Sequence, residues 1–264
     1  MKLDIIKKYA QAYSAILSGQ RNPSFTHIYI DAFAGAGKHI SRKTGEFIAG
    51  SPLNALAVEP PFKEYHLIDV DKQKIRELEK VVSGRHDVFL YNSDCNEVLL
   101  SKVFPRVSYE EYKRGLCILD PYGLHLDWEV IKTAAEMRSV EIFLNFPVMD
   151  MNMNVLWRSG QEHVDPYQAQ RMTAFWGDES WKEVGYRSDL GLFGEIRTKA
   201  DNETIAMAFQ KRLRKTAGFE YVPKPVPMRN TKGATVYYLF FACQKPVALK
   251  IVREIFDKYG KLST

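Results

Sequence analysis

The stretch HIYIDAFAGAGK, residues 27–38, places a short apolar run directly before a glycine-rich turn. The run His27–Ile30 predicts a buried β-strand, and the turn behind it carries two glycines, Gly35 and Gly37. A turn of this kind at the end of a first strand is typical of α/β proteins that bind a ligand at the edge of a parallel sheet. The spacing within the turn decides which ligands it can accept.

A phosphate-binding loop does not fit this spacing. A Walker loop needs a glycine five residues before its Gly-Lys pair and a Ser or Thr after it, because backbone amides wrap the phosphates while the hydroxyl holds magnesium. Here those two places are taken by Ala32 and His39. A dinucleotide fingerprint needs a third glycine where this chain has Ile40. We therefore expect the turn to face a ligand that has no pyrophosphate, with Lys38 as a loop residue.

The rest of the chain alternates short β-rich runs with helical patterns. After a leading helix at Ile5–Leu17, strands are predicted at residues 27–30, 65–68, 88–91, 116–119 and 140–144, and helices at 51–58 (with Ser51 as its cap), 72–82, 97–100 and 128–137. Lys38–Gly50 is expected to be a loop. Continuous apolar strands separated by helices predict a parallel sheet covered on both faces.

The pattern changes after Pro147. Residues 148–200 carry three of the four tryptophans and show no strand alternation, so we interpret them as a cap inserted into a single domain that spans 1–264. A helix at 203–216 follows, then a predicted antiparallel hairpin of 221–228 and 235–242, and a last helix at 247–259. The fold class is therefore α/β, a doubly wound and mostly parallel seven-stranded sheet with a terminal antiparallel hairpin.

Acids follow four successive strands, at Asp31, Asp69, Asp94 and Asp120. Any one of them could simply cap the next helix. Because the carboxyl ends of parallel strands meet at one edge of a sheet, their recurrence indicates a ligand site. This order of elements resembles the class I methyltransferase fold, which implies S-adenosylmethionine as cofactor. The resemblance assigns its methionine end to Asp31, Phe33, Ala34, Gly35 and Gly37, the ribose to Asp69 and the adenine amino group to Asp94.

The fourth strand end, LDPYG at residues 119–123, resembles the DPPY motif of amino-methyltransferases and the DPFG variant of tRNA guanine-N2 methyltransferases. The resemblance implies that Asp120 and the Pro121 carbonyl orient a target amine while Tyr122 stacks on a base. The second proline of DPPY is missing here, and Tyr122 could instead pack beneath the cap.

Three other polar positions near this motif stay open. Asn145, in the segment Asn145-Phe146-Pro147 after the fifth strand, could line the pocket or be structural. His125 lies close to the motif, and Asp127 is explained most simply as a helix cap.

The whole chain also resembles the bacterial three-Cys-motif partner proteins (TcmP). The matching segments cover most of residues 1–260 in the same order: KKYAQAYSAIL, IYIDAFAGAGK, AGSPLNAL, HLIDVD, ILDPYGL, FLNFP and FWGDESW. This resemblance implies a protein partner that bears a three-cysteine motif, with an iron–sulfur or radical-type enzyme as one option. The chain's own cysteines are too widely spaced to be that motif.

Composition adds broad limits. The chain has 264 residues with 45% hydrophobic content, a net charge of +5 and three cysteines, which we expect to be reduced, buried thiols. No apolar run or leader suggests a membrane or secretory route, so cytoplasm is expected.

Three functions remain in order of preference. The first is methylation of an exocyclic amine, most simply of a nucleobase in DNA or RNA, with Arg42 and Lys43 near the substrate entrance. The second is a cofactor-binding partner subunit with little activity. The third is a magnesium-dependent phosphate enzyme that uses the aspartates.

Overall fold

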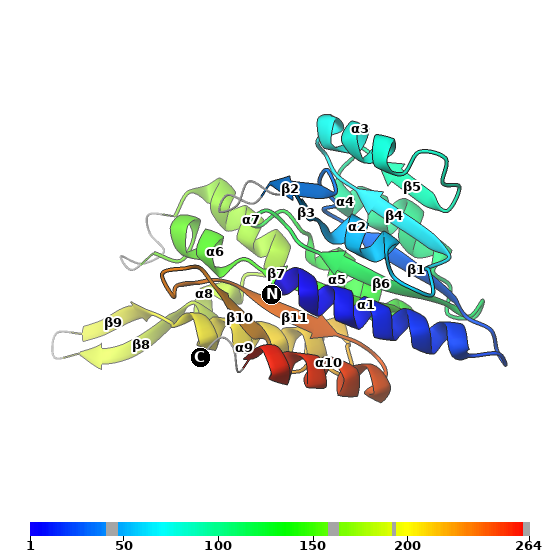
Figure 1. The fold of residues 1–264 in the computed structure, drawn as a ribbon. Helices are drawn as coiled ribbons and strands as arrows, with labels where there is room; N and C mark the ends of the chain where they lie inside the picture. The colour runs from blue at the N-terminus through cyan, green and yellow to red at the C-terminus, as the bar shows by residue number, and fades with distance from the viewer. Residues whose placement is uncertain (41–46, 158–163, 192–193, 261–264) are drawn as a thin grey trace.

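A seven-stranded sheet forms the centre of the protein (Figure 1). The computed structural model describes residues 1–40, 47–157, 164–191 and 194–260, and its strands lie in the order β10-β11-β7-β6-β1-β4-β5. Their bounds are β1 (Thr26–Asp31), β4 (Glu64–Ile68), β5 (Val88–Tyr91), β6 (Lys113–Leu119), β7 (Val140–Phe146), β10 (Val226–Arg229) and β11 (Thr235–Ala242). The first five pair in parallel, whereas β11 runs antiparallel to β7 and to β10. The predicted doubly wound, mostly parallel seven-stranded sheet with a terminal antiparallel hairpin is confirmed.

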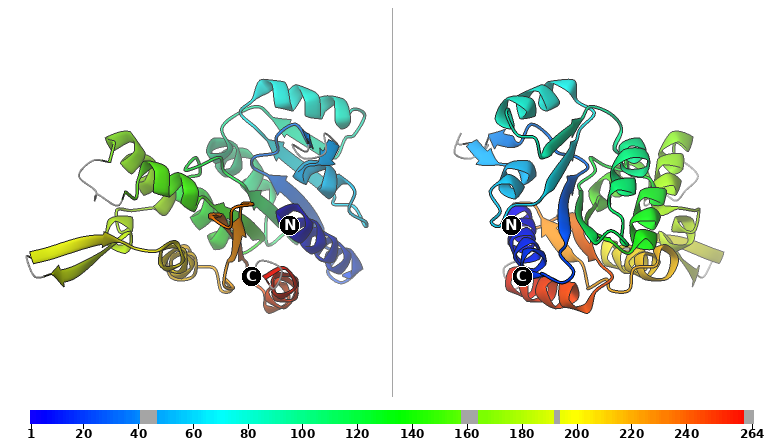
Figure 2. Two further views of the ribbon diagram at one scale, coloured as in Figure 1. Left: turned by 60° about the vertical axis from the view of Figure 1, so that its left-hand side comes forward. Right: turned by 90° about the vertical axis from the view of Figure 1, so that its right-hand side faces the viewer.

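Helices cover both faces of the sheet because successive side chains on each buried strand point to opposite sides. One face carries α1 (Lys2–Gly19), α2 (Ser51–Leu56), α3 (Lys72–Val81) and α10 (Pro246–Gly260). The other carries α4 (Cys95–Val98), α5 (Trp128–Met137) and α9 (Asn202–Arg212). The first and last helices, α1 and α10, lie side by side on their face (Figure 2). On β1, Ile28 and Ile30 face the α5 side, and Tyr29 faces α1.

Two predicted helices differ in how they start and end. The short helix expected at 97–100 begins at Cys95, because the Asp94 side chain accepts hydrogen bonds from the first-turn amides, and it continues as a π-helix, Leu99–Val103, and a 3-10 turn, Phe104–Arg106. The helix expected to run to Thr216 changes at Arg212 into a π-helix, Leu213–Ala217.

Strand structure replaces part of the loop expected at Lys38–Gly50. Its ends form a small antiparallel pair, β2 (Lys38–Ile40) and β3 (Phe47–Ala49), so the prediction of a loop is wrong there. The pairing closes the turn: the Gly50 amide donates to the Gly37 carbonyl at 2.8 Å. Arg42 and Lys43 lie outside the described residues.

The segment 148–200 contains α6 (Val148–Asn154), α7 (Pro166–Trp176), α8 (Trp181–Val184) and a hairpin of β8 (Tyr186–Gly191) and β9 (Gly194–Lys199). The expectation that this segment contains no strands is therefore wrong. Two of its tryptophans, Trp176 and Trp181, are buried in the core, and their indole nitrogens donate to Ser180 and Thr173, both at 2.9 Å. These rings thicken one layer of the fold, and a capping role of the segment stays a prediction.

The three cysteines are free and buried, as expected. No helix within the described ranges is both long enough and apolar enough to cross a membrane.

Candidate functional site

A cleft of about 990 Å³ lies at the carboxyl ends of β1, β4, β5 and β6. In the sheet β1 is the strand with β4 on one side and β6 on the other, so the chain order reverses there, which is where open α/β sheets bind their ligands. The residues that line the cleft are Ala32, Phe33, Gly35, Ala36, Asp69, Val70, Asp71, Lys74, Ser93, Asp94, Cys95, Asp120, Tyr122 and His125. Of the sequence-predicted residues, the structure brings together Phe33, Gly35, Asp69, Asp94, Asp120 and Tyr122.

The glycine turn crosses the top of the sheet between two neighbouring strands. The Ala32 amide donates to the Ile118 carbonyl at 3.0 Å and the Ala34 amide to Ile68 at 2.8 Å, which fixes the turn over β6 and β4. Gly35 has a φ of +63° and open space where a Cβ would stand. Its backbone is therefore free to meet a ligand.

Gly37 has a different role. Its φ is +73°, and a Cβ there would lie 2.9 Å from Leu78 of α3. This glycine, like the buried Ala34, lies behind the cleft and allows close packing, while Gly35 alone of the two faces the opening.

Asp31 also lies behind the cleft surface. Its side chain is fully buried and accepts hydrogen bonds from the Phe33 amide at 3.2 Å, from the Tyr29 hydroxyl at 3.3 Å and from the Ser51 side chain. Burial raises the pKa of the Asp31 carboxyl to about 6, although these donors lower it. The carboxylate holds the turn from below.

Ser51 was expected to cap α2, and that prediction is wrong. The N-cap is Gly50, which makes no side-chain bond, and the Ser51 side chain is directed to Asp31 instead. A serine before a proline reads as a helix cap, so sequence gave no signal of this second use.

Asp69 links the second strand to the glycine turn. One carboxylate oxygen accepts from the Gly35 amide and the other from the Asp71 amide, both at 2.9 Å, while Lys74 lies 3.8 Å away. Asn92, at the end of β5, donates to the carbonyls of Asp69 and Val70 and so holds this strand end in place. The sequence reasoning missed Asn92, whose only signal was its place after a strand.

Asp94 combines both roles that the sequence allowed. Its Oδ1 accepts from the amides of Asn96 and Glu97, at 2.8 and 3.3 Å, and so caps α4. Both of these bonds use the same oxygen, and the residue also lines the cleft. A capping acid at this edge can therefore present its second oxygen to a ligand.

Asp120 and Tyr122 lie at the other side of the cleft. Tyr122 is 91% exposed, so the alternative in which its ring packs beneath the inserted segment is wrong. Pro121 is buried and does not line the opening. The chain turns back at Gly123, where φ is +71° and a Cβ would lie 2.8 Å from the Asp150 carboxylate.

Asp150, on α6, holds this turn in place. It accepts from the Leu124 amide at 3.2 Å and lies 3.6 Å from Arg171. The inserted segment thus fixes the turn that projects Tyr122 into solvent. The sequence singled out Gly123 as part of the LDPYG stretch but did not indicate Asp150, because their contact joins residues 27 positions apart.

Lys2 of α1 forms an ion pair with the carboxylate of Asp120. Its Nζ lies 2.5 Å from Oδ2 of Asp120 and 5.3 Å above the centre of the Tyr237 ring. Burial lowers the pKa of the Lys2 ammonium, but Asp120 and then Tyr237 raise it by more, so the net shift is upward. A charged amine therefore occupies one oxygen of Asp120, a contact that no local pattern in the sequence indicated.

The remaining polar candidates near the motif differ in whether they line the cleft. His125 lines the cleft, and burial lowers its pKa. Asp127 stands at the N-cap of α5 without a side-chain capping bond, so its expected capping bond is absent. Phe146 is core, and Asn145 has a buried Oδ1 without a hydrogen-bond partner among the described residues. The residues that the structure describes hold no group of three or more His, Cys, Asp or Glu placed to bind a metal ion.

Known proteins match this chain in structure. No family model matches it, and no curated protein does. The solved structure of protein LPL1258 from Legionella pneumophila matches over 97% of this chain and 92% of its own, with 12% identity and a TM-score of 0.54. A Leishmania major protein described as a SAM-dependent methyltransferase matches across 91% of this chain and 72% of its own, with 11% identity and a TM-score of 0.42. The first likeness supports the fold, and at this identity it extends to the fold alone.

Proposed function

We propose that the protein is an S-adenosylmethionine-dependent methyltransferase that acts on an exocyclic amine of a nucleobase. The observation that carries this proposal is the convergence of Gly35, Asp69, Asp94 and Asp120 on one cleft at the point where the strand order reverses. Each comes from a different strand end, so the groups are spread along an elongated ligand. When bound, S-adenosylmethionine supplies the methyl group.

The side chains at the β4 and β5 ends suit an adenosine. Asp69 already accepts two amides, and each carboxylate oxygen keeps a further lone pair for a ribose hydroxyl. Val70, next in sequence, is 69% exposed on the cleft and offers an apolar surface to a base. Asp94 has one oxygen outside its capping bonds for the adenine amino group. These hydrogen-bond acceptors and the apolar Val70 surface fit the nucleoside part of the cofactor.

The glycine turn suits the methionine part. The Gly35 backbone is open to the cleft, and Phe33 lines it next to that position. Asp31, Ala34 and Gly37 support this part from behind: Asp31 fixes the turn through the Phe33 amide, and Gly37 lets α3 approach. We therefore propose a supporting role for these three residues in place of the direct cofactor contacts that the resemblance implies.

Asp120 and Tyr122 suit the acceptor. Asp120 is half-buried and can accept a hydrogen bond from an amine, as it now does from Lys2. The exposed Tyr122 ring offers a stacking surface, which contributes about 1–3 kcal/mol per base in single-stranded nucleic acid complexes. Holding the amine and its ring together in this way would lower the barrier by positioning.

Cofactor binding is tested first by calorimetry with S-adenosylmethionine and S-adenosylhomocysteine. We expect saturable binding of both ligands. Their affinity should be about tenfold or more lower in Asp69→Asn, because a carboxylate hydrogen bond is lost. Asp127→Asn is the matched control, since this acid lies outside the cleft lining and makes no capping bond. No binding of either ligand would reject the proposal.

Methyl transfer needs its own test. Labelled S-adenosylmethionine is incubated with RNA and single-stranded DNA, and the modified base is identified by mass spectrometry. We expect label on a base amine. Asp120→Asn should abolish this labelling, while binding of S-adenosylhomocysteine persists. Cofactor binding without label on either nucleic acid would reject the assigned substrate class.

A second candidate function is a cofactor-binding subunit of the three-Cys-motif partner that the TcmP resemblance implies. The Lys2–Asp120 ion pair favours it, because the candidate catalytic carboxylate is already engaged. Co-expression with the partner followed by size-exclusion chromatography decides between the two. A stable complex that binds S-adenosylhomocysteine but transfers no methyl group supports the subunit, and turnover by the isolated chain supports the enzyme.

A further inference from the structure

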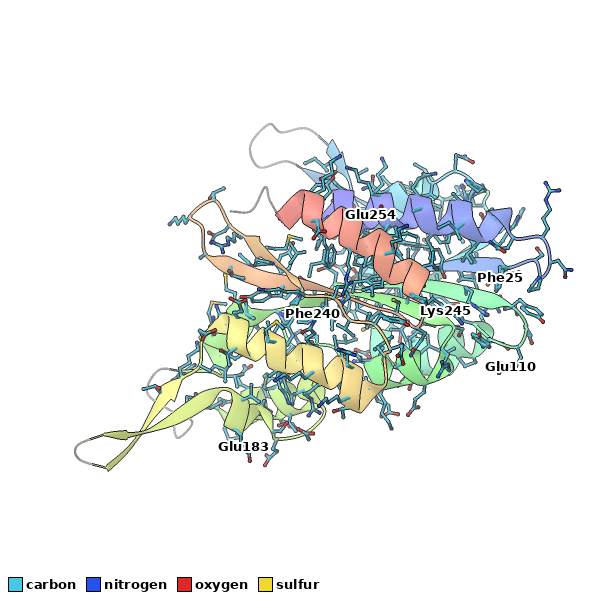
Figure 3. The ribbon with its side chains drawn as sticks, turned by 90° about the horizontal axis from the view of Figure 1, so that it is seen from below. Phe25, Glu110, Glu183, Phe240, Lys245 and Glu254 are labelled. Atoms are coloured by element: carbon cyan, nitrogen blue, oxygen red, sulfur yellow. The ribbon has the colours of Figure 1, made fainter. Side chains whose placement is uncertain are left out.

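A second cavity of about 210 Å³ lies at the opposite end of the sheet, where β6 and β7 begin. It is enclosed by α1, by the start of α10 and by the chain before β6, and Phe25 and Lys245 mark its place at the end of the molecule where α10 begins (Figure 3). None of its lining residues also lines the cleft described above. It is therefore a separate site.

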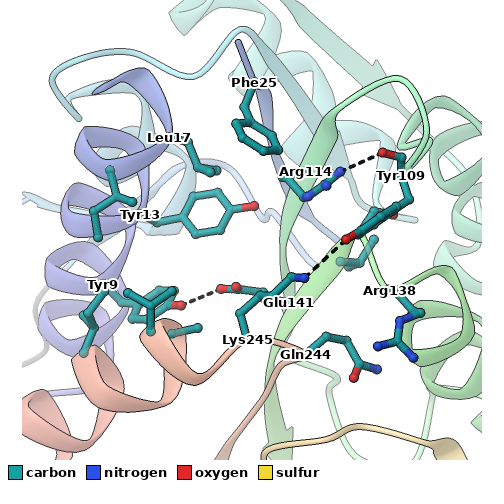
Figure 4. Close-up of a pocket in the computed structure, with 16 residues that line it drawn as sticks. Tyr9, Tyr13, Leu17, Phe25, Tyr109, Arg114, Arg138, Glu141, Gln244 and Lys245 are labelled. Carbon is teal, nitrogen blue, oxygen red and sulfur yellow. Dashed lines mark hydrogen bonds between the residues drawn. The ribbon is translucent and has the colours of Figure 1, made fainter. Parts of the chain in front are cut away.

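An unpartnered hydroxyl points into this cavity. Tyr13 of α1 directs its ring and hydroxyl between Phe25 and Glu141 (Figure 4). The side chain is more than nine-tenths buried, and its hydroxyl has no hydrogen-bond partner among the described residues. Since buried polar groups are nearly always hydrogen-bonded, the orphaned hydroxyl indicates a missing partner that accepts or donates at this point.

The walls of the cavity are mainly aromatic and aliphatic. Tyr9, Tyr13, Phe25 and Tyr109 present rings, and Ile16, Leu17, Val247 and Ile251 complete the apolar surface. An engineered cavity of roughly 150 Å³ lined by such groups binds benzene. The present cavity therefore accommodates one ring with a short substituent.

The charges around the cavity are unbalanced. Arg114, Arg138 and Lys245 line it, and none of them forms an ion pair with a carboxylate in the part of the chain that the structure describes. Arg114 lies 4.0 Å from the centre of the Tyr109 ring, and Lys245 donates to the Tyr109 hydroxyl at 3.2 Å. The charge available here is three cations against one acid.

That acid, Glu141, is already engaged. The Tyr9 hydroxyl donates to its Oε2 at 2.5 Å, as the dashed line in Figure 4 shows. Burial raises the pKa of the Glu141 carboxyl to about 7, so near neutral pH it carries only part of a charge. The local field is consequently positive.

We propose that this cavity binds a small organic anion, a single aromatic ring that carries a carboxylate. The ring lies among the aromatic side chains, the carboxylate accepts from the Tyr13 hydroxyl, and Arg114, Arg138 and Lys245 balance its charge. A cationic ring is disfavoured, because the aromatic faces of Tyr109 and Phe25 are already covered by Arg114.

Calorimetry of the full chain with benzoate tests this site, with benzylamine and benzyl alcohol as ring-matched cationic and neutral probes. We expect saturable benzoate binding at about 1 mM or tighter, at least about tenfold stronger than either control. Tyr13→Phe should weaken benzoate about tenfold, since it removes a hydrogen bond to a charged group. Tyr167→Phe, which removes an exposed hydroxyl outside both sites, should leave benzoate binding unchanged.

A blocking variant keeps the test independent of the hydroxyl. Val247 is half-exposed at the rim, so Val247→Trp can cover the opening without disturbing the core, and it should abolish benzoate binding while S-adenosylhomocysteine titrations stay unchanged. Benzoate binding that survives in Val247→Trp, a preference for benzylamine, or no saturable binding of benzoate by the unmodified protein would each overturn the proposal.

Discussion

The ammonium of Lys2 lies 2.5 Å from the carboxylate of Asp120, although the two residues are 118 positions apart in the chain. The contact brings the first helix to the acid that follows the fourth parallel strand. Asp31, the acid of the first strand end, also contributes to the raised pKa of Lys2. Lys2 thus pairs with Asp120 and also lies within electrostatic range of Asp31.

Removal of this cation should change the preference between cofactor and product. S-adenosylmethionine carries a sulfonium charge that S-adenosylhomocysteine lacks, so the Lys2 ammonium should repel the first more than the second. In Lys2→Met we expect the ratio of their affinities to shift toward S-adenosylmethionine by about three- to tenfold. Calorimetry with both ligands measures the ratio, and Lys7→Met, on an exposed position of the same helix, is the control. An unchanged ratio would show that Lys2 acts only on the conformation of Asp120.

Glu141 should make the stability of the protein depend on pH. Burial raises the pKa of the Glu141 carboxyl to about 7 in the folded protein from its ordinary value of 4.5, so the folded state retains a proton that the unfolded chain releases. Stability from this group is therefore greatest below pH 4.5 and falls as the pH rises to about 7.

Glu141→Gln removes this dependence. We expect the difference in melting temperature between the variant and the unmodified protein to move in the variant's favour from pH 5 to pH 8. Asp31, with a pKa of about 6, contributes a trend of the same sign in both proteins and cancels in the difference. A difference that stays constant over this range would contradict the assignment of Glu141 as the buried acid.

Gly123→Ala should cost stability and activity together. The substituted residue would have to keep a φ of +71°. Its Cβ would lie 2.8–3.1 Å from the three atoms of the Asp150 carboxyl group. Gly84→Ala is the matched control, because Gly84 has a φ of +80° but open space around it. We expect Gly123→Ala to lower the free energy of unfolding by about 1–3 kcal/mol more than the control does. Equal losses in a denaturant titration would mean that Asp150 yields easily and does not fix the turn.

The sheet could be predicted from the sequence because its signals are local. Each parallel strand contains an apolar run, and β5 and α5 have the bounds that their patterns predict. The antiparallel hairpin of β10 and β11 was also predicted from its turn, but its first strand is Val226–Arg229 and not the expected 221–228. The β8–β9 hairpin was missed because its residues show no clear alternation.

The site was only partly predictable. Strand-end acids could be placed on one edge, because parallel topology brings such residues together, but which of them face the ligand depends on side-chain contacts. Asp31 is drawn inward by Ser51, and Asp120 is engaged by Lys2, and both partners come from other elements of the fold. Such long-range pairs leave no periodic trace in the sequence.

Tyr122 should act in catalysis without affecting stability. Its ring is 91% exposed and makes no core contact, so Tyr122→Ala should leave the melting temperature within the usual range of surface substitutions. If the ring stacks on the acceptor base, the variant should lose about 1–3 kcal/mol of substrate interaction, a roughly 5- to 150-fold reduction in kcat/KM. Tyr122→Phe keeps the stacking surface and should retain most activity. If Tyr122→Ala and the unmodified protein methylate the nucleic-acid substrate equally well, stacking is ruled out and base recognition lies elsewhere in the cleft.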